Sequence, residues 1–409
     1  MINPRMLHIS DPMIWIITAL LVFIGIFMII STTYNAELKA ERDPFSFAKR
    51  QFGSLFLGLA LMSFFAFIDY GNLKKFAPLF YLFMLMILVL VLFGGRAASG
   101  AQRWIMLGPL SFQPSEISKL LLIVSLAAFF NSRGEKTNIW ETLLVVAIPF
   151  LLIFRQPDLG TGLVMIAIAV GMLIWGKSSP VLLTMIFSPL ASIYFRQNLY
   201  LWIAYILVLW GALYFSRVKL FDLFLIMTIN IGVGIALPIL WGLFKPYQQM
   251  RVLSFLNPGI DPHGIGYHTL QSKIAIGSGG FFGKGFMHGT QTQLQFVPIQ
   301  NSDFIFSAIG EELGFWGSTL VVSLFATLIW RIFKIAESAY DYWGSMLAAG
   351  IGVMFLFHFI VSVGMNLGVL PVVGIPLPFV SFGGTSLVVN LAAIGIIQSI
   401  AMRRQKLVF

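Results

Sequence analysis

The chain has 409 residues, of which 58% are hydrophobic and only 10% are charged. Together with a mean hydropathy of +0.89, this composition excludes a soluble globular domain and predicts an integral membrane protein. The net charge of +10 suits anionic lipid headgroups or a phosphorylated substrate. No nucleic-acid partner is expected, because no basic, aromatic-interleaved patch lies on a soluble domain. The chain has no cysteine, which excludes disulfides and thiolate chemistry.

Twelve predominantly apolar segments follow one another along the chain, and each is predicted to be a membrane-spanning helix. Their bounds are 13–33, 53–70, 77–94, 114–130, 139–154, 160–176, 180–195, 197–215, 219–243, 303–331, 344–364 and 379–401. Lipid cannot satisfy exposed backbone groups, so we predict an all-α polytopic bundle of about twelve transmembrane helices. The first segment has no small-residue cleavage signal and is expected to remain as an anchor. No linker or charge run divides the chain, which predicts one membrane domain over residues 1–409.

An even number of spans places both termini on the same side of the membrane. Every short loop or tail on that side carries Lys or Arg, whereas the basic residues of the other side lie mostly in long loops. The positive-inside rule holds for short loops, so we expect cytoplasmic termini. The long polar stretch 245–302 is then a large extracytoplasmic loop.

Four polar clusters interrupt the apolar sequence, and on this topology all four lie at the outer side. Their convergence predicts a single functional site. The clusters are residues 101–104 with 113–119, residues 156–161, residues 245–302, and residues 374–384.

Charged side chains begin two of the predicted spans. Glu116 and Lys119 are three residues apart, so they can meet on one helix face as a structural ion pair. Intramembrane charges also tend to line a cavity or substrate path, and both interpretations can hold together. Asp158, between Pro157 and Leu159, is either a turn or helix-cap residue or a member of the site.

The glycine-rich stretch 277–285 superficially suggests a phosphate-binding loop. It fails the Walker pattern, because Ser278 replaces the first glycine and Gly285 replaces the Ser or Thr. Its amides with Lys284 can form an anion-binding nest, or the stretch is a re-entrant turn. The histidines of the polar loop match no defined metal-site spacing, so solvated loop histidines are the default for His263, His268 and His288.

Asp303 is the strongest catalytic candidate, because it stands where the polar loop meets a long predicted helix. Its alternative role is a helix N-cap together with Ser302. A carboxylate at the membrane surface beneath a basic loop can also act as a general base. Glu311 and Glu312 follow about 12 Å further along the helix, where at least one of them is expected to face protein or water.

Several of these segments resemble the SEDS family of polytopic peptidoglycan polymerases, which includes RodA and FtsW. The matching segments include Gly100-Ala-Gln-Arg-Trp104, Phe112-Gln-Pro-Ser-Glu-Ile-Ser-Lys119, Gln156-Pro-Asp-Leu-Gly-Thr161, Gln271-Ser-Lys-Ile-Ala-Ile-Gly-Ser-Gly-Gly280, Gly289-Thr-Gln-Thr-Gln-Leu294, Asp303-Phe-Ile-Phe306, Gly310-Glu-Glu-Leu-Gly314 and the 378–384 run. The segments starting at Gln291 and Asp303 look more like RodA than FtsW. The resemblance covers most of the chain. It implies the family's usual core of ten helices, to which this chain adds a pair near 180–215.

The resemblance also implies an inverting glycosyltransferase that joins lipid II units into β-1,4 glycan strands outside the cytoplasmic membrane, for cell elongation and shape. Asp303 would take the proton of the acceptor hydroxyl. A divalent cation, Mg²⁺ or Mn²⁺, could assist on the pyrophosphate, although no cofactor is certain. The implied partners are lipid II, a class B penicillin-binding protein that crosslinks the product, and membrane lipids. Motif positions implicate further residues in substrate binding, namely Arg103, Glu116, Lys119, Asp158, Arg251, Lys273, Ser278, Lys284, Gln291 and Gln293.

Two local departures from the family pattern flank the candidate base. The chain has Asn301-Ser302 where the family usually has His-Thr, and Ser381-Phe382-Gly-Gly-Thr385 where it has Ser-Tyr-Gly-Gly-Ser. These put local hydrogen bonding in doubt. An alternative function is a lipid II flippase, but a flippase needs a polar path open to each side in turn, and the inner loops are short.

Overall fold

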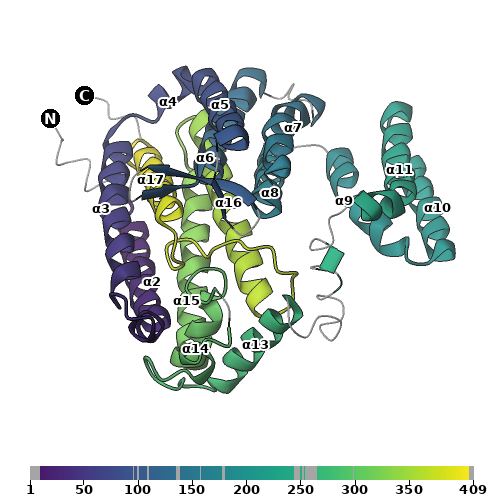
Figure 1. Ribbon diagram of the computed structural model, residues 1–409. Coiled ribbons are helices and arrows are strands. Elements are labelled where there is room, and N and C mark those ends of the chain that lie inside the picture. The colour runs from purple at the N-terminus through teal and green to yellow at the C-terminus, as the bar shows by residue number, and fades with distance from the viewer. Residues whose placement is uncertain are drawn as a thin grey trace. The chain divides into compact units, whose positions relative to one another are not determined.

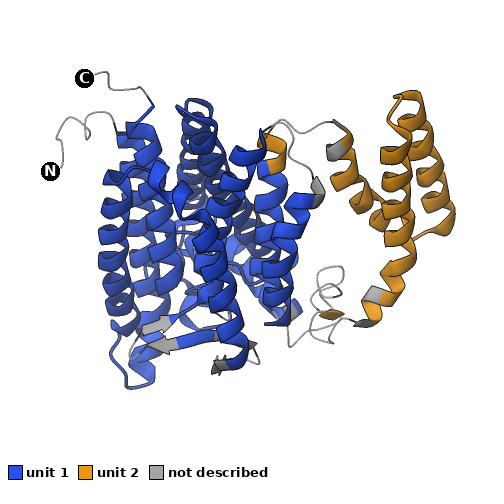
Figure 2. Ribbon diagram, turned by 90° about the horizontal axis from the view of Figure 1, so that it is seen from above, with its two compact units in different colours: residues 1–172, 253–409 blue, residues 173–252 orange. Residues whose placement is uncertain are grey.

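The computed structural model describes residues 10–94, 96–98, 101–107, 110–134, 139–156, 158–176, 180–243, 249–250, 253, 265–297 and 299–404. The chain forms two compact units, one of residues 1–172 and 253–409 and the other of residues 173–252 (Figure 2). The single domain expected over residues 1–409 stays a prediction.

Each of the twelve predicted spans coincides with a helix (Figure 1). The helices are α2 (Pro12–Lys39), α3 (Ser46–Phe67), α5 (Ala77–Gly94), α6 (Pro114–Arg133), α7 (Ile139–Arg155), α8 (Leu159–Trp175), α9 (Pro180–Phe195), α10 (Leu199–Phe215), α11 (Leu220–Leu243), α15 (Ile305–Glu337), α16 (Tyr342–Asn366) and α17 (Gly384–Met402). Within the described residues, seven of them are long and apolar enough to cross a membrane. The prediction of an all-α polytopic membrane protein is therefore confirmed.

The pair predicted near 180–215 forms α9 and α10, which pack with α11 in the second unit. Polar side chains join these apolar helices. Asn230 donates a hydrogen bond to Ser188 Oγ at 2.8 Å, and Trp202 donates one to Ser192 Oγ at 2.8 Å. Such buried interhelical hydrogen bonds stabilise helix packing where lipid offers no competing partner.

The first unit is built around α17, whose most apolar 18-residue window is 94% buried. This helix packs against α3, α6 and α16. Helices α17 and α3 approach each other closely at Gly395, where a Cβ would collide with the backbone of Met62 on α3. Glycine at this position permits that close packing. Short helices α4 (Gly71–Lys75), α13 (Ile265–Ser278) and α14 (Thr290–Gln293) complete the unit. Figure 1 shows α4 and α14 at its opposite ends.

A small antiparallel sheet precedes α6, where the sequence predicts a polar cluster but no strands. It consists of β1 (Arg96–Ala98), β2 (Ala101–Leu107) and β3 (Leu110–Phe112) in the order β1-β2-β3. The β2 strand contacts α6, and β3 contacts α17. The sheet therefore carries the 101–104 motif to the N-terminal ends of two core helices.

Helix α15 is broken at Gly314, whose φ of 68° lies in the left-handed region that favours glycine. The glycine-rich stretch 277–285 covers this break. The amides of Lys284 and Gly285 donate to the carbonyl oxygens of Glu311 and Glu312, each at 3.0 Å, and the amide of Phe315 donates to the carbonyl of Gly280 at 2.9 Å. Three backbone groups at the break are thus satisfied by the stretch, as the re-entrant-turn interpretation expects.

Candidate active site

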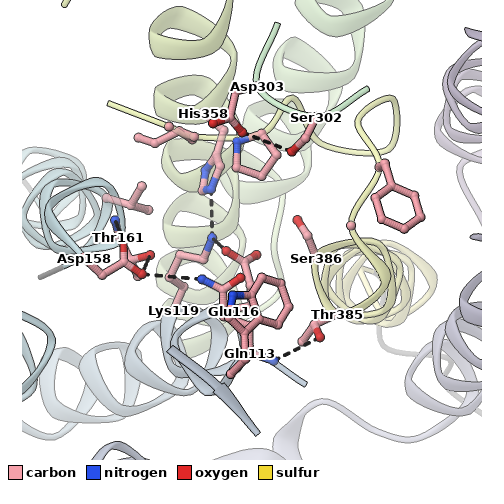
Figure 3. A pocket seen from close by; sticks show the side chains of 17 residues that line it. Gln113, Glu116, Lys119, Asp158, Thr161, Ser302, Asp303, His358, Thr385 and Ser386 are labelled. Carbon is pink, nitrogen blue, oxygen red and sulfur yellow. Dashed lines mark hydrogen bonds and ion pairs between the residues drawn. The ribbon is translucent and has the colours of Figure 1, made fainter. Parts of the chain in front are cut away.

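One cavity of about 200 Å³ in the first unit is lined by residues from all four polar clusters (Figure 3). It lies where the N-terminal ends of α6, α8 and α17 meet the segment that precedes α15. Its lining residues include Trp104, Gln113, Glu116, Lys119, Asp158, Thr161, Ser302, Asp303, His358, Gly374, Gly383, Thr385 and Ser386. The structure therefore brings together segments that lie more than 280 positions apart in the chain.

Glu116 and Lys119 form the predicted ion pair, with Lys119 Nζ 2.8 Å from Glu116 Oε1 and both side chains almost fully buried. Lys119 Nζ also lies 2.9 Å from Nε2 of His358 on α16. The pair also lines the wall of the cavity. It is therefore both a structural ion pair and a group of charges at a cavity. Burying an ion pair carries a desolvation cost that direct contact must offset, and here the contact uses only Oε1, since Glu116 Oε2 is buried without a hydrogen-bond partner in the described residues.

Asp158 caps the N-terminus of α8. Its Oδ1 accepts from the amide of Thr161 at 3.3 Å, and its Oδ2 accepts from the Thr161 hydroxyl at 3.0 Å. Ser115 at the start of α6 donates to the same Oδ2 at 3.2 Å. The helix-cap interpretation of Asp158 thus holds, and the same carboxylate still faces the cavity.

Asp303 lies in the segment that leads into α15. Ser302 Oγ donates to its Oδ1 at 3.0 Å, and Asn366 Nδ2 donates to its carbonyl oxygen at 3.0 Å. Phe304 occupies the N-cap position without a side-chain cap, so the capping alternative for Asp303 is wrong. Helix α15 therefore begins at Ile305, and the Asp303 carboxylate lies at the cavity.

The two departures from the family pattern contact each other beside Asp303. Ser381 Oγ donates to the carbonyl of Ser302 at 2.7 Å, and the amide of Phe382 donates to the carbonyl of Asn301 at 2.8 Å. Both contacts use backbone carbonyls, which do not depend on the identity of residues 301 and 302. The altered side chains therefore leave the link between the two segments intact.

The cavity holds three carboxylates and one ammonium group among the described residues. Glu116, Asp158 and Asp303 supply oxygen ligands of the kind that Mg²⁺ and Mn²⁺ prefer. No group of three acidic or histidine side chains in the described residues is close enough together to hold an ion. The cavity therefore does not fit a preformed metal site, and the candidate cation stays a prediction.

Four other predicted binding residues surround Glu311 and Glu312 in α15, and none of them lines the cavity. Lys284 Nζ lies 2.8 Å from Glu311 Oε1, and the amide of Gln291 donates to the same oxygen at 2.8 Å. Ser278 donates to it weakly at 3.5 Å, and Gln293 donates to Glu312 Oε1 at 3.1 Å. Both glutamates are buried and face protein. Their contacts tie the 278–293 segment to the break in α15.

Of the other three predicted cations, only the side chain of Lys273 is described, and it does not line the cavity. Lys273 is exposed on α13, beside Gly368. The side chain of Arg103 and the whole of Arg251 and His263 lie outside the described residues. Of the other loop histidines, His268 packs edge-on against Phe304, and His288 is exposed.

His358 is the cavity residue that the sequence reasoning missed. It is buried, and its Nδ1 lies 2.7 Å from the carbonyl oxygen of Met354. Its partner Lys119 is 239 positions away. An ionisable residue inside an apolar span is by default a functional candidate, and that signal was available in the sequence.

Comparison with known proteins decides the family. The family model of FtsW, RodA and SpoVE, described as "Cell cycle protein", matches residues 11–180 and 175–406. The chain belongs to this family. It is 35% identical to the peptidoglycan glycosyltransferase MrdB of Escherichia coli over 404 residues, which cover 98% of this chain and 95% of MrdB. It is 34% identical to the stage V sporulation protein E of Bacillus subtilis, with 96% of each chain covered.

Solved structures of relatives share the fold of this family member. The chain resembles the crystal structure of the rod shape determining protein RodA of Thermus thermophilus with a TM-score of 0.64, at 25% identity and with 97% of this chain and 98% of that chain covered. A second match, with a TM-score of 0.69 and 27% identity, is a structure on the coordination of polymerization and crosslinking by a peptidoglycan synthase complex. It covers 97% of this chain and 99% of that chain.

Proposed function

We propose that this protein is a peptidoglycan glycosyltransferase that polymerises lipid II into β-1,4 glycan strands for cell elongation and shape. The names of its relatives support this activity, since both MrdB of E. coli and RodA of Treponema pallidum are peptidoglycan glycosyltransferases, at 35% and 32% identity. The observation that carries the proposal is the position of Asp303. Its carboxylate stands in a cavity to which all four polar clusters contribute.

In the proposed reaction Asp303 acts as the general base. The 4-hydroxyl of the acceptor GlcNAc attacks the anomeric carbon of the donor MurNAc, and its proton passes to the Asp303 carboxylate. The new bond joins that oxygen to the anomeric carbon with inversion. The bond from the anomeric carbon to the pyrophosphate oxygen breaks, and undecaprenyl pyrophosphate leaves with the electron pair. A pyrophosphate departs without a protein acid once its charge is stabilised, so one carboxylate can suffice.

The charges of the cavity favour a site for the sugar hydroxyl over a site for the pyrophosphate. Three carboxylates against one ammonium group suit a neutral sugar hydroxyl and disfavour a pyrophosphate. We therefore assign the sugar end of the substrate to the cavity. The pyrophosphate is assigned to cations outside the cavity, for which Arg103 is the first candidate because of its position in the 101–104 motif. Arg251 and Lys273 remain further candidates.

The proposed enzyme works at the outer face of the bacterial cytoplasmic membrane with both termini inside. The apolar helices and the family membership establish an integral membrane protein, and the charge distribution of the short loops supports the orientation. We propose a class B penicillin-binding protein as the partner that crosslinks the glycan. The matched structure on a peptidoglycan synthase complex supports such a partner.

The test is polymerisation of fluorescent lipid II by the purified protein. Asp303→Asn keeps the volume and removes the base, so glycan synthesis should fall at least a hundredfold. Asp43→Asn changes an exposed aspartate in the loop between α2 and α3 and serves as the matched control, with activity expected to stay at the wild-type level. Transport of lipid II across vesicles without synthesis, at equal rates in wild type and Asp303→Asn, would instead support the flippase.

A further inference from the structure

A second polar pocket lies at the other end of α17 from the cavity. Ser386 near the start of α17 lines the cavity, and Arg404 just beyond its end lines the second pocket. Eighteen residues separate the two positions, which corresponds to about 27 Å along the helix axis. The second pocket is therefore independent of the proposed reaction.

Three cations line this pocket, which is formed by the C-terminal ends of α15 and α17. Arg331 and Arg404 share a single buried carboxylate, that of Asp11, with Arg404 Nη2 3.9 Å from its Oδ2. The other oxygen, Oδ1, accepts from the amides of Met13 and Ile14 as the N-cap of α2. Lys334 is exposed and lies 3.4 Å from Glu337.

The two arginines of this pocket have more hydrogen-bond donors than the Asp11 carboxylate can accept from. Each guanidinium has five N–H donors, while Asp11 is the one carboxylate that pairs with the two arginines in the described residues. The Nε atoms of Arg331 and Arg404 are both buried without a hydrogen-bond partner in that part of the chain. Arginine groups of this kind bind phosphate oxygens well, because the donors match them geometrically. Glu337 also lines the pocket, so three cations face one lining carboxylate, and this excess of positive charge favours an anion.

The surroundings favour a lipid over a soluble anion. Trp330 lines the pocket, is 54% exposed and stacks beside the Arg331 guanidinium, an arrangement typical of a membrane–water interface. Directly after Asp11, helix α2 exposes Met13, Ile16, Leu20 and Phe23 at helical spacing along one face. A phosphate held at the pocket would place acyl chains beside this apolar face.

We propose that the pocket formed by Trp330, Arg331, Lys334 and Arg404 binds the phosphate headgroup of an anionic phospholipid. The lipid belongs to the leaflet on the opposite side of the membrane from Asp303. The headgroup bridges the ends of α15 and α17 at the start of α2, and it contacts the exposed parts of the two guanidinium groups and the Lys334 ammonium group.

The test counts lipids bound to the purified full chain by native mass spectrometry, with phosphatidylglycerol, phosphatidylcholine or inorganic phosphate added. Wild-type protein should bind phosphatidylglycerol in preference to phosphatidylcholine. The variant Lys334→Gln/Arg404→Gln keeps the Asp11–Arg331 pair, and its affinity for phosphatidylglycerol should fall about 30-fold if each cation contributes as basic residues at anionic surfaces do. The charge-conserving variant Lys334→Arg/Arg404→Lys should bind more tightly than the Gln variant but less tightly than the wild type, because it keeps both charges and loses the guanidinium of Arg404.

The matched control is Lys74→Gln/Lys75→Gln, which removes two exposed positive charges from α4 without touching the pocket. Its affinity should change less than threefold. An equal loss of phosphatidylglycerol affinity in Lys74→Gln/Lys75→Gln and in Lys334→Gln/Arg404→Gln would overturn the proposal in favour of diffuse surface attraction. Equal binding of both lipids by the wild type would also overturn it. Displacement of the lipid by millimolar inorganic phosphate, with phosphate itself retained, would identify a free-anion site instead.

Discussion

Lys119 on α6 and His358 on α16 meet in the wall of the cavity, with Nζ and Nε2 2.9 Å apart. The carbonyl oxygen of Met354 can only accept a hydrogen bond, so the His358 Nδ1 that lies 2.7 Å from it carries the proton. Nε2 is then the acceptor for the Lys119 ammonium group. The imidazole thereby orients the one cation of the cavity that the described residues provide.

The first prediction concerns this acceptor. His358→Leu leaves a buried ammonium donor unsatisfied and should destabilise the protein by about 1 to 3 kcal/mol and lower glycan synthesis more than tenfold. His358→Gln offers an amide oxygen in a side chain of similar reach. It should retain most of the stability and most of the glycan synthesis. Thermal unfolding in detergent and lipid II polymerisation measure the two effects. Wild-type activity in His358→Leu would contradict a role in orienting Lys119.

The second prediction concerns the Glu116–Lys119 pair. Lys119→Met leaves the Glu116 carboxylate buried without its cation and should cost about 3 to 5 kcal/mol. Adding Glu116→Gln removes that unpaired charge, so the double variant should recover much of the stability. Thermal unfolding of the single and double variants is the measurement. A double variant less stable than Lys119→Met alone would show that the pair is not the main source of the loss.

The third prediction concerns the break in α15. Alanine at Gly314 is strained at a φ of 68° and would place a Cβ against the backbone of Gly283, so Gly314→Ala should destabilise the protein by at least about 2 kcal/mol. Gly277 on α13 has open space around it and serves as the control. Gly277→Ala should be neutral or should stabilise by up to about 1 kcal/mol. Equal unfolding temperatures for the two variants would refute the strain.

The fourth prediction separates structural from substrate-binding roles for Lys284. Its ammonium group contacts Glu311 Oε1, together with the amide of Gln291. Lys284→Met should therefore speed proteolysis of the 279–293 loop several-fold while KM for lipid II changes less than threefold. Glu311→Gln, which weakens every contact to that carboxylate, should have a larger effect on proteolysis. A raised KM with unchanged proteolysis would return Lys284 to the substrate-binding residues.

The features that the sequence predicts well are local. The Glu116–Lys119 pair follows from a three-residue spacing on a helix, and the cap role, one of the two alternatives for Asp158, follows from its place between Pro157 and Leu159 at a helix start. The twelve helices follow from hydropathy alone, because backbone satisfaction in lipid leaves apolar segments few alternatives.

The features that were missed depend on contacts between distant segments. His358 reaches Lys119 from another helix, and no spacing encodes that pairing. Lys284 and the glycine amides turn toward the carboxylate and carbonyl groups of α15 instead of toward a substrate anion. The strands at 96–112 are short, and among the described residues they pair with one another, so their pattern is too brief to distinguish from a loop.

The enclosure of α17 has a consequence for biogenesis. This helix follows every other described helix in the chain, yet it occupies the core and contributes Thr385 and Ser386 to the cavity wall. Its neighbours α3, α6 and α16 all precede it in the chain, so they are synthesised before the helix that they enclose. The cavity wall is therefore incomplete until α17 has been synthesised and has packed into the core, which ties the formation of the site to translation past residue 402.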